Sequence, residues 1–171
     1  VGSEMCIRDS QLFNLPVVPA NMKTVIDENL ARSLSDVGFF YIMHRFDISN
    51  YSFVERANKE NWKTISISVG VKQSDIETLE RIANDDLRVD YITIDIAHGH
   101  SILVKNTIKE IRTLFGDKTF IIAGNVATSD AVNEITEWGA DAIKVGIGQG
   151  SPCTTKDKTG FTMPMFSCML E

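Results

Sequence analysis

The sequence predicts an α/β fold built around a parallel sheet, and three observations support this prediction. Apolar, strand-like runs alternate strictly with segments of helical period along the chain. The runs are mostly continuous apolar rather than alternating, which is typical of strands buried on both faces of a parallel sheet. Polar residues or glycines follow nearly every run, namely Asn21, His44 with Arg45, Gly70, Asp95 with His98, Asn125 and the loop 146–153.

Six runs are predicted to form strands. The run KTISISVG is rich in β-branched residues, which favour the extended conformation. The run LPVVPANM is short and apolar and is closed by a polar turn. In chain order, the predicted strands are 15–22, 39–45, 63–70, 89–99, 119–126 and 141–148.

Five helices are predicted between these strands, and capping residues place several of their ends. Residues 27–38 have apolar residues at helical spacing, and Gly38 follows as a C-terminal cap. Residues 73–86 form an amphipathic pattern, with Ser74 as N-cap and Glu77 three residues later as in a capping box. The other helices are 49–61 starting near Ser49, 101–116 ending at Gly116, and 128–139 running from Thr128 or Ser129 to Gly139.

Strict alternation leaves two architectures, an open doubly wound sheet or a (β/α)8 TIM barrel. The polar residues at the strand ends favour the barrel, because all carboxyl ends of its strands meet at one mouth. An open sheet gathers only the ends that flank its switch point. A barrel typically needs about 250 residues, whereas this chain has 171. The prediction is therefore an incomplete barrel with about six of eight βα units.

The two ends of the chain differ from the regular middle. Residues 1–10 show no clear period and are interpreted as a non-native leader. Residues 11–161 are assigned to the partial barrel, which is the catalytic domain. Residues 162–171 are an atypical tail in which no clear helical or strand period is seen. We expect the chain to be truncated and inactive alone.

Composition excludes several classes of function. The formal net charge is −6 and the pI is near 5.1, which gives no reason to expect nucleic-acid binding. No apolar run approaches the roughly 20 residues that span a bilayer, and no signal peptide is recognised. The three cysteines, Cys6, Cys153 and Cys168, are irregularly spaced, which argues against a disulfide framework and for a reducing compartment. We therefore expect a cytoplasmic protein that binds neither nucleic acid nor membranes.

The loop KVGIGQGSPCTT, residues 144–155, carries the most chemical information. Its glycines allow the backbone to approach a ligand closely, with N–H groups that can bind an anion or C=O groups that can bind a cation. A thiol at this position can be held beside a ligand as a nucleophile, and the hydroxyls of Thr154 and Thr155 can position a water or leaving group. The alternative is that Cys153 is a small buried apolar side chain in an ordinary turn.

The segment IKVGIGQGSPCTT resembles the signature loop of the IMP dehydrogenase and GMP reductase family. The segments VVPANM, GFFYIMHR, YITIDIAHGHS and IIAGNVAT extend the resemblance in the right order, over roughly residues 12–161. Within the family, IDIAHGH is similar to bacterial GMP reductases, whereas IMP dehydrogenases typically carry a DSSQG-like segment there. They also usually carry a regulatory insertion, for which residues 46–64 leave no room.

The resemblance implies NADPH-dependent reductive deamination of GMP to IMP and ammonia through a covalent cysteine–purine intermediate. It implies that Cys153 attacks purine C2 and that Thr155 assists proton transfer. It also implies a potassium ion on backbone carbonyls and a homotetramer when full length. The residues implied are Asp95, Arg45 and Ala97 for the cofactor, Asn21, Asn125 and Gly146 for the substrate, and Gly148, Gly150 and Cys153 for the metal.

Some residues depart from the family pattern, and two other functions stay open. Gln149 replaces the usual proline, Pro152 the usual aliphatic residue, and Arg45 a common lysine. His98 and His100 suggest a metal site, but no third ligand is evident, so a solvated or supporting role is favoured. The alternative functions are IMP dehydrogenase and, from a different class, a non-catalytic barrel remnant.

Overall fold

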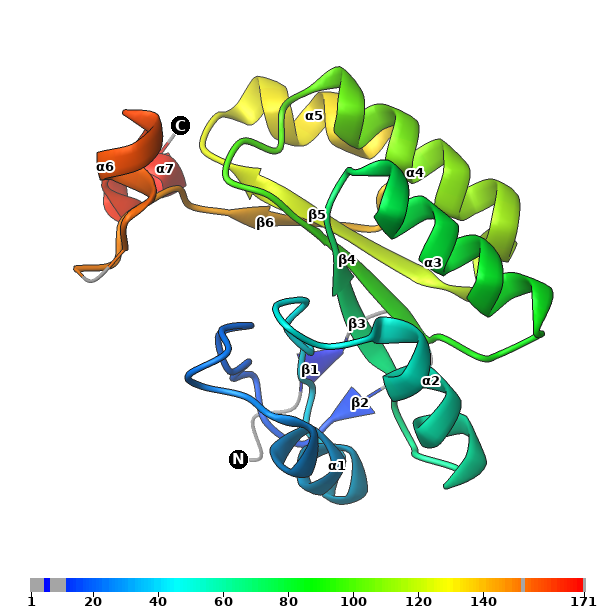
Figure 1. Ribbon diagram of the computed structural model, residues 1–171. Coiled ribbons are helices and arrows are strands. Elements are labelled where there is room, and N and C mark those ends of the chain that lie inside the picture. The colour runs from blue at the N-terminus through cyan, green and yellow to red at the C-terminus, as the bar shows by residue number, and fades with distance from the viewer. Residues whose placement is uncertain (1–4, 7–11, 152, 171) are drawn as a thin grey trace. The chain divides into compact units, whose positions relative to one another are not determined.

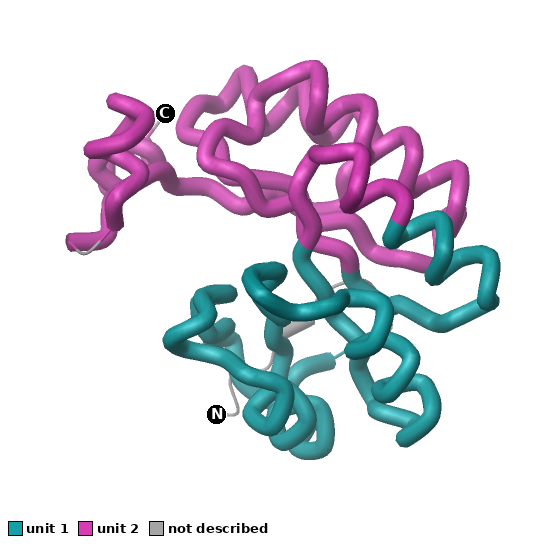
Figure 2. Tube along the Cα trace, viewed as in Figure 1, with its two compact units in different colours: residues 1–68, 78–91 teal, residues 69–77, 92–171 magenta. Residues whose placement is uncertain are grey.

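The structure is a computed structural model that describes residues 5–6, 12–151 and 153–170. The chain divides into two compact units (Figure 2). Unit 1 contains residues 1–68 and 78–91, and unit 2 contains residues 69–77 and 92–171. The predicted leader, residues 1–10, lies outside the described residues except for Met5 and Cys6, and so does Pro152.

The main sheet contains four strands in the order β3-β4-β5-β6 (Figure 1). β5 and β6 pair in parallel, with Ile122 opposite Ala142. A separate antiparallel pair joins β1 and β2. The strands are β1 Met5–Cys6, β2 Leu12–Phe13, β3 Ser66–Val69, β4 Tyr91–Asp95, β5 Phe120–Val126 and β6 Ala142–Val145.

Four of the six predicted strands are confirmed as β3 to β6, and two predictions are wrong. Residues 15–22 form no strand, because Pro16 and Pro19 lack the N–H donors that a central strand needs. Residues 39–45 are mostly buried, but only an isolated parallel bridge, Met43 to Ile67, is formed there. The apolar composition of residues 39–45 therefore predicted correctly that the segment is buried, but not that it forms a regular strand.

The five predicted helices are all present, and their caps are local. The Asp27 carboxylate accepts the N–H of Leu30 at 2.8 Å, and Gly38 ends the first helix with φ of 74°. Ser49, Ser101 and Thr128 are likewise N-caps. The helices are α1 Glu28–Val37, α2 Asn50–Lys59, α3 Gln73–Asn84, α4 Ile102–Phe115 and α5 Ser129–Glu137, and a 3₁₀ turn, η1, follows α4 at Gly116–Lys118.

The predicted capping box at Ser74 is wrong. The third predicted helix begins at Gln73, so Ser74 lies inside its first turn. The backbone N–H of Lys72 donates to the carboxylate of Asp75 at 3.1 Å. An acidic side chain three residues on therefore reaches back to the position before the helix, two residues earlier than Ser74 and Glu77 suggest.

Unit 1 is held together by an aromatic cluster and a polar network. Phe40 packs between Phe13 and Tyr91, with ring centroids 5.1 and 4.9 Å apart.

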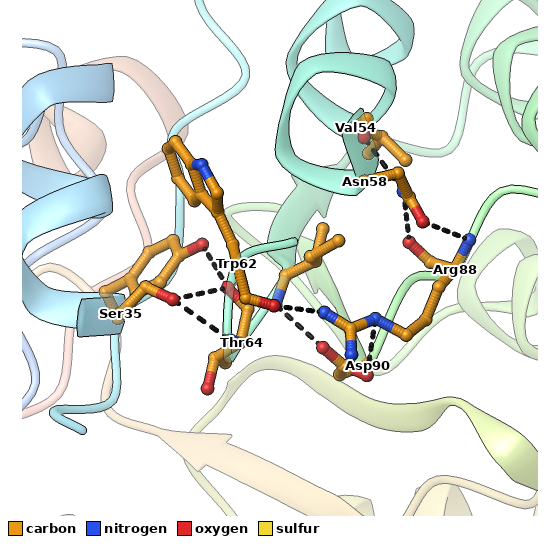
Figure 3. A network of polar contacts seen from close by, with 9 residues as sticks. Ser35, Val54, Asn58, Trp62, Thr64, Arg88 and Asp90 are labelled. Atoms are coloured by element: carbon orange, nitrogen blue, oxygen red, sulfur yellow. Dashed lines mark hydrogen bonds and ion pairs between the residues drawn. The ribbon is translucent and has the colours of Figure 1, made fainter. Parts of the chain in front are cut away.

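In the polar network of unit 1, the hydroxyl of Ser35 accepts the N–H of Thr64 at 3.0 Å (Figure 3). The carboxylate of Asp90 accepts the N–H of Ile65 at 2.7 Å. Arg88 donates to the carbonyl of Trp62 and lies beside Asp90, and Asn58 bonds both the N–H and the C=O of Arg88.

In unit 2, α4 and α5 lie along one face of β5 and β6 (Figure 1). Arg112 of α4 joins the loops at the amino ends of these strands. Its guanidinium donates to the carbonyls of Gly139 at 2.8 Å and Thr119 at 2.8 Å, and to the carboxylate of Asp141 at 2.6 Å. Asp141 in turn accepts the N–H of Ile121 at 2.7 Å.

Two short helices follow the sheet. α6, Thr155–Thr159, follows Cys153, and α7, Met165–Leu170, occupies the tail in which the sequence shows no clear helical period. α7 buries Cys168, which lines a cavity of about 220 Å³ with Val145 and the start of α5. No helix among the described residues is long and apolar enough to cross a membrane.

Candidate functional site

The candidate site in unit 2 lies where β4, β5 and β6 end. Asp95 is the last residue of β4, Asn125 is near the end of β5, and Gly146 directly follows β6. Backbone hydrogen bonds hold the ends of β4 and β5 together, since the N–H of Asn125 donates to the carbonyl of Ile96 at 2.9 Å. The structure therefore brings together three of the predicted site residues, each from a different strand.

Asp95 forms an ion pair with Lys144, a residue that sequence reasoning missed. The Lys144 Nζ lies 3.4 Å from the Asp95 carboxylate, and the two side chains are 34% and 20% exposed. The one signal in the sequence is a lysine inside the otherwise apolar run AIKV. Because the two residues are 49 positions apart, the pair itself could not be predicted. It places a positive charge beside the carboxylate that is predicted to face the cofactor.

Asn125 fixes the start of the loop that follows β6. Its amide nitrogen donates to the carbonyl of Gly146 at 2.7 Å, and the pairing of β5 with β6 shifts register between Gly124 and Val126. Gly124 allows the close approach, because a Cβ there would lie 2.6 Å from both Cβ and the carbonyl oxygen of Lys144. The asparagine side chain thus links the predicted substrate residues of β5 and β6.

The residues 146–163, which we call the cysteine loop, leave β6 and return to its end. Gly146 and Gly148 have positive φ values of 116° and 64°, a conformation that favours glycine. The N–H of Met163 donates to the carbonyl of Ile147 at 3.0 Å, and the hydroxyl of Thr162 bonds the same carbonyl at 3.3 Å. The loop is therefore closed at its base, and the predicted role of its glycines in shaping the backbone agrees with their geometry.

Cys153 is half-buried near the middle of the cysteine loop. Its N–H donates to the carbonyl of Gly150 at 3.0 Å, which forms a turn just before α6. Hydrogen bonds from the hydroxyl and the backbone N–H of Thr155 hold the pKa of the Cys153 thiol below its ordinary value. A partly accessible thiol with a lowered pKa is the form in which cysteine acts as a nucleophile.

The predicted metal ligands are backbone carbonyls of the same loop. The carbonyl of Gly148 accepts the Thr162 hydroxyl at 3.2 Å, and that of Gly150 accepts the N–H of Cys153. A carbonyl oxygen has a second lone pair, so these bonds leave each oxygen able to bind a cation. Within the described residues, no group of three or more His, Cys, Asp or Glu side chains could hold a metal ion. Carbonyl oxygens are ligands that suit hard cations.

The two predicted site residues of unit 1 lie on separate segments. Asn21 is buried, and the guanidinium carbon of Arg45 lies 4.9 Å from the ring centroid of Phe46. The neighbouring His44 is buried and accepts the N–H of Phe46 on Nδ1 at 3.2 Å. It lines a cavity of about 290 Å³ with residues of α1 and α2, among them Glu28 and Arg56, which pair at 2.5 Å.

The segment after β4 holds the remaining predicted residues. Ala97 is exposed. His98 stacks on Phe161, with ring centroids 5.4 Å apart and an interplanar angle of 20°. His100 instead stacks on Trp138 and lies 3.1 Å from the carboxylate of Glu134. The two histidines thus have different partners, in agreement with a supporting role rather than a shared metal.

Comparisons with known proteins identify relatives of this chain. A profile of the IMP dehydrogenase / GMP reductase domain matches residues 4–171. A GMP reductase of Mesoplasma florum is 55% identical over 149 residues, which cover 87% of this chain and 46% of that protein. A GMP reductase of Helicobacter pylori is 53% identical over 150 residues, covering 87% of this chain and 45% of that protein. The chain thus spans about half the length of the curated relatives it matches.

A solved structure is similar over nearly the whole chain. It is the inosine 5′-monophosphate dehydrogenase of Legionella pneumophila, with a TM-score of 0.79 and 35% identity. The match covers 94% of this chain and 48% of that one. This likeness confirms the predicted class, a parallel-strand α/β fold of the TIM-barrel type that is present here in part.

Proposed function

This chain belongs to the IMP dehydrogenase / GMP reductase family, and we propose that it forms part of an enzyme that converts GMP to IMP and ammonia with NADPH. The curated relatives that support this activity are named GMP reductase and are 53–55% identical. The observation that carries the chemistry is the half-buried Cys153, whose thiol pKa is lowered by its hydrogen bonds with Thr155.

In the proposed reaction, the Cys153 thiolate attacks C2 of the guanine base. The bond from C2 to the exocyclic nitrogen then breaks, and the Thr155 hydroxyl relays a proton to the departing ammonia. NADPH, when bound, supplies the hydride that reduces C2 of the resulting thioimidate. The carbon–sulfur bond breaks, IMP leaves and the thiolate is regenerated. The overall reaction consumes GMP, NADPH and protons, and it yields IMP, NADP⁺ and ammonium. Covalent catalysis divides one difficult displacement into easier steps.

The other site residues have binding roles in this proposal. We assign Asp95, Ala97 and Arg45 to the cofactor, and Asn21, Asn125 and Gly146 to the nucleotide. Support for the second set comes from the hydrogen bond of 2.7 Å between Asn125 and Gly146, which fixes the backbone at the start of the cysteine loop. In this proposal a potassium ion bound by carbonyls of Gly148, Gly150 and Cys153 would order the loop.

A chimera tests the proposed activity. Residues 12–161 of this chain replace the corresponding segment of the Mesoplasma florum GMP reductase, and NADPH oxidation is followed with and without GMP. We expect GMP-dependent oxidation that requires potassium and that is lost in the Cys153→Ser variant. A chimera that instead prefers IMP with NAD⁺ would support the alternative, IMP dehydrogenase, the activity for which the similar Legionella protein is named.

We also propose that the 171-residue chain alone does not turn over, since it spans about half the length of its relatives. GMP-dependent NADPH oxidation by the purified chain would contradict this. Alkylation of Cys153 in the purified chain, measured with and without GMP, tests the remaining alternative. Protection by GMP indicates a formed nucleotide site, and no protection indicates a non-catalytic remnant.

We propose a cytoplasmic location and a homotetramer for the full-length protein. Support for the location comes from the odd number of cysteines, of which Cys153 and Cys168 are free thiols. Cell fractionation tests the location. Light scattering on the full-length protein tests the assembly, where a monomer would contradict it.

A further inference from the structure

The cysteine loop is tied to the rest of unit 2 beyond its own base. Phe161 lies near the end of the loop, and its carbonyl is 3.1 Å from the position that a Cβ on Gly148 would occupy. The backbone of Phe161 therefore lies directly against the glycine segment at the start of the loop. Its side chain is 55% exposed, so burial in a core does not hold it in place.

The ring of Phe161 instead stacks on His98, which belongs to the segment after β4. The ring centroids are 5.4 Å apart and the planes differ by 20°. Offset stacking of two aromatic rings is a favourable contact. This contact joins the far end of the cysteine loop to the segment that follows Asp95.

His98 is well placed to act as an anchor because the backbone on both sides of it is fixed. The N–H of Ile96 donates to the carbonyl of Gly124 at 3.1 Å, and the N–H of Gly99 donates to the carbonyl of Asn125 at 2.8 Å. Gly99 permits this approach, since a Cβ there would lie 2.9 Å from the Asn125 oxygen. The imidazole therefore projects from a segment that is bonded to β5.

We propose that His98 is a positioning residue for the cysteine loop, which it holds through its stack on Phe161 so that the loop carrying Cys153 stays tied to the segment after β4. The role of Cys153 in this inference rests on the proposed function, whereas the contact between the two rings does not.

His100 provides a matched control two residues away. Its ring stacks on Trp138 at 5.7 Å, and its Nε2 lies 3.1 Å from Glu134. Both partners belong to α5 or directly follow it. Replacing His100 therefore removes a histidine, an aromatic stack and a contact with a carboxylate from the same segment without touching Phe161.

Limited trypsin digestion of the 171-residue chain measures how well the loop is held. Lys156 and Lys158 lie in α6 inside the cysteine loop, and cleavage after them requires local opening of the loop. We expect His98→Ala to raise the initial cleavage rate at these lysines about two- to tenfold, the range that corresponds to loss of one aromatic stack. His98→Phe, which keeps a ring, and His100→Ala are both expected to cleave at the wild-type rate.

A second variant, Phe161→Leu, removes the other ring and is expected to give the same increase, which keeps the test decisive where His98→Ala fails to fold. A His98→Ala rate equal to that of His100→Ala would overturn the proposal, and so would a failure of His98→Phe to restore the wild-type rate. Digestion needs no GMP or NADPH. An inactive chimera therefore counts against the proposed function alone, and unchanged digestion counts against the positioning role alone.

Discussion

Arg112→Lys keeps the positive charge, yet it is expected to destabilise the protein strongly. The guanidinium makes hydrogen bonds to the carbonyls of Gly116, Thr119 and Gly139 and to the Asp141 carboxylate. A lysine ammonium has three donors on one atom and cannot reach all of these acceptors. Hydrogen bonds to a charged group contribute about 1.5–3 kcal/mol each.

The side chain of Arg112 is 22% exposed, so water can form part of the hydrogen bonds that the substitution removes. We therefore expect a net loss of about 2–3 kcal/mol in the free energy of unfolding, from the loss of at least two such bonds. For a chain of this size that corresponds to a midpoint lower by about 5–10 °C. Urea and thermal denaturation, both followed by circular dichroism, measure the two quantities.

The matched control is Arg32→Lys, because Arg32 is 57% exposed and pairs across the surface with Glu60 at 3.2 Å. It is expected to change the free energy of unfolding by less than about 0.5 kcal/mol. If Arg112→Lys costs no more than this control, then the guanidinium network does not hold the strand starts, and the reasoning is refuted.

Three further predictions concern strand packing and ionisable groups. Gly124→Ala is expected to lower the free energy of unfolding by about 2 kcal/mol or more, because its Cβ would lie 2.6 Å from the backbone of Lys144; urea denaturation at the wild-type midpoint would contradict this. Burial raises the pKa of Asp90, against the opposing effects of the Ile65 N–H and Arg88. Asp90 in the folded state therefore keeps its proton to a higher pH than in the unfolded state. The free energy of unfolding of the wild type, relative to that of Asp90→Asn, is expected to fall as the pH rises above about 4. If urea titrations show that this difference in free energy stays constant or rises between pH 4 and 7, the predicted sign is wrong. Thr155→Val removes the hydroxyl whose hydrogen bond is the largest cause of the lowered thiol pKa of Cys153. The variant is expected to slow alkylation of Cys153 by iodoacetamide at pH 7 about two- to tenfold. The rate is measured on the tryptic peptide 145–156, which contains no other cysteine, and an unchanged rate would mean that the hydroxyl does not acidify the thiol.

The starts of α1, α2, α4 and α5 were predictable from the sequence because their causes are local, whereas the predicted cap of α3 at Ser74 was wrong. Asp27, Ser49, Ser101 and Thr128 each accept an N–H within three residues, so a short window of sequence contains the whole interaction. The short helix α7 was missed, although Pro164 directly precedes it. A proline at the start of a helix is the signal that could have indicated it.

Strand status was less predictable because it depends on neighbours. Residues 39–45 have the composition of a strand, yet only Met43 forms a bridge. In the candidate site, too, features set by neighbouring residues in the sequence could be predicted and contacts between distant residues could not. The cysteine, its threonine and the glycines could be assigned from one loop of the sequence, whereas the pair of Asp95 with Lys144 and the stack of His98 on Phe161 join residues 49 and 63 positions apart.

The two compact units repeat one device at the starts of their strands. The backbone N–H of Asp90 donates to the carbonyl of Ile65, and its carboxylate accepts the N–H of the same isoleucine. Asp141 makes the same two contacts with Ile121. Each aspartate thus fixes the register of its own strand against the preceding one, at the end of the strands where barrel proteins keep stability rather than chemistry.

This separation has a consequence for how variants should behave. Asp141 and Arg112 lie at the amino ends of the strands, whereas Asn125, Gly146 and Cys153 belong to the carboxyl ends and the loop beyond them. Effects of sites that share no partner add. Variants of Arg112 should therefore lower the unfolding midpoint while the alkylation rate of Cys153 in the folded protein stays constant. Thr155→Val should lower the alkylation rate of Cys153 while the unfolding midpoint stays constant. A change of thiol reactivity in Arg112→Lys would mean that the strand starts and the cysteine loop are coupled through β5 and β6, and the positioning of Cys153 would then extend beyond its contacts at the loop.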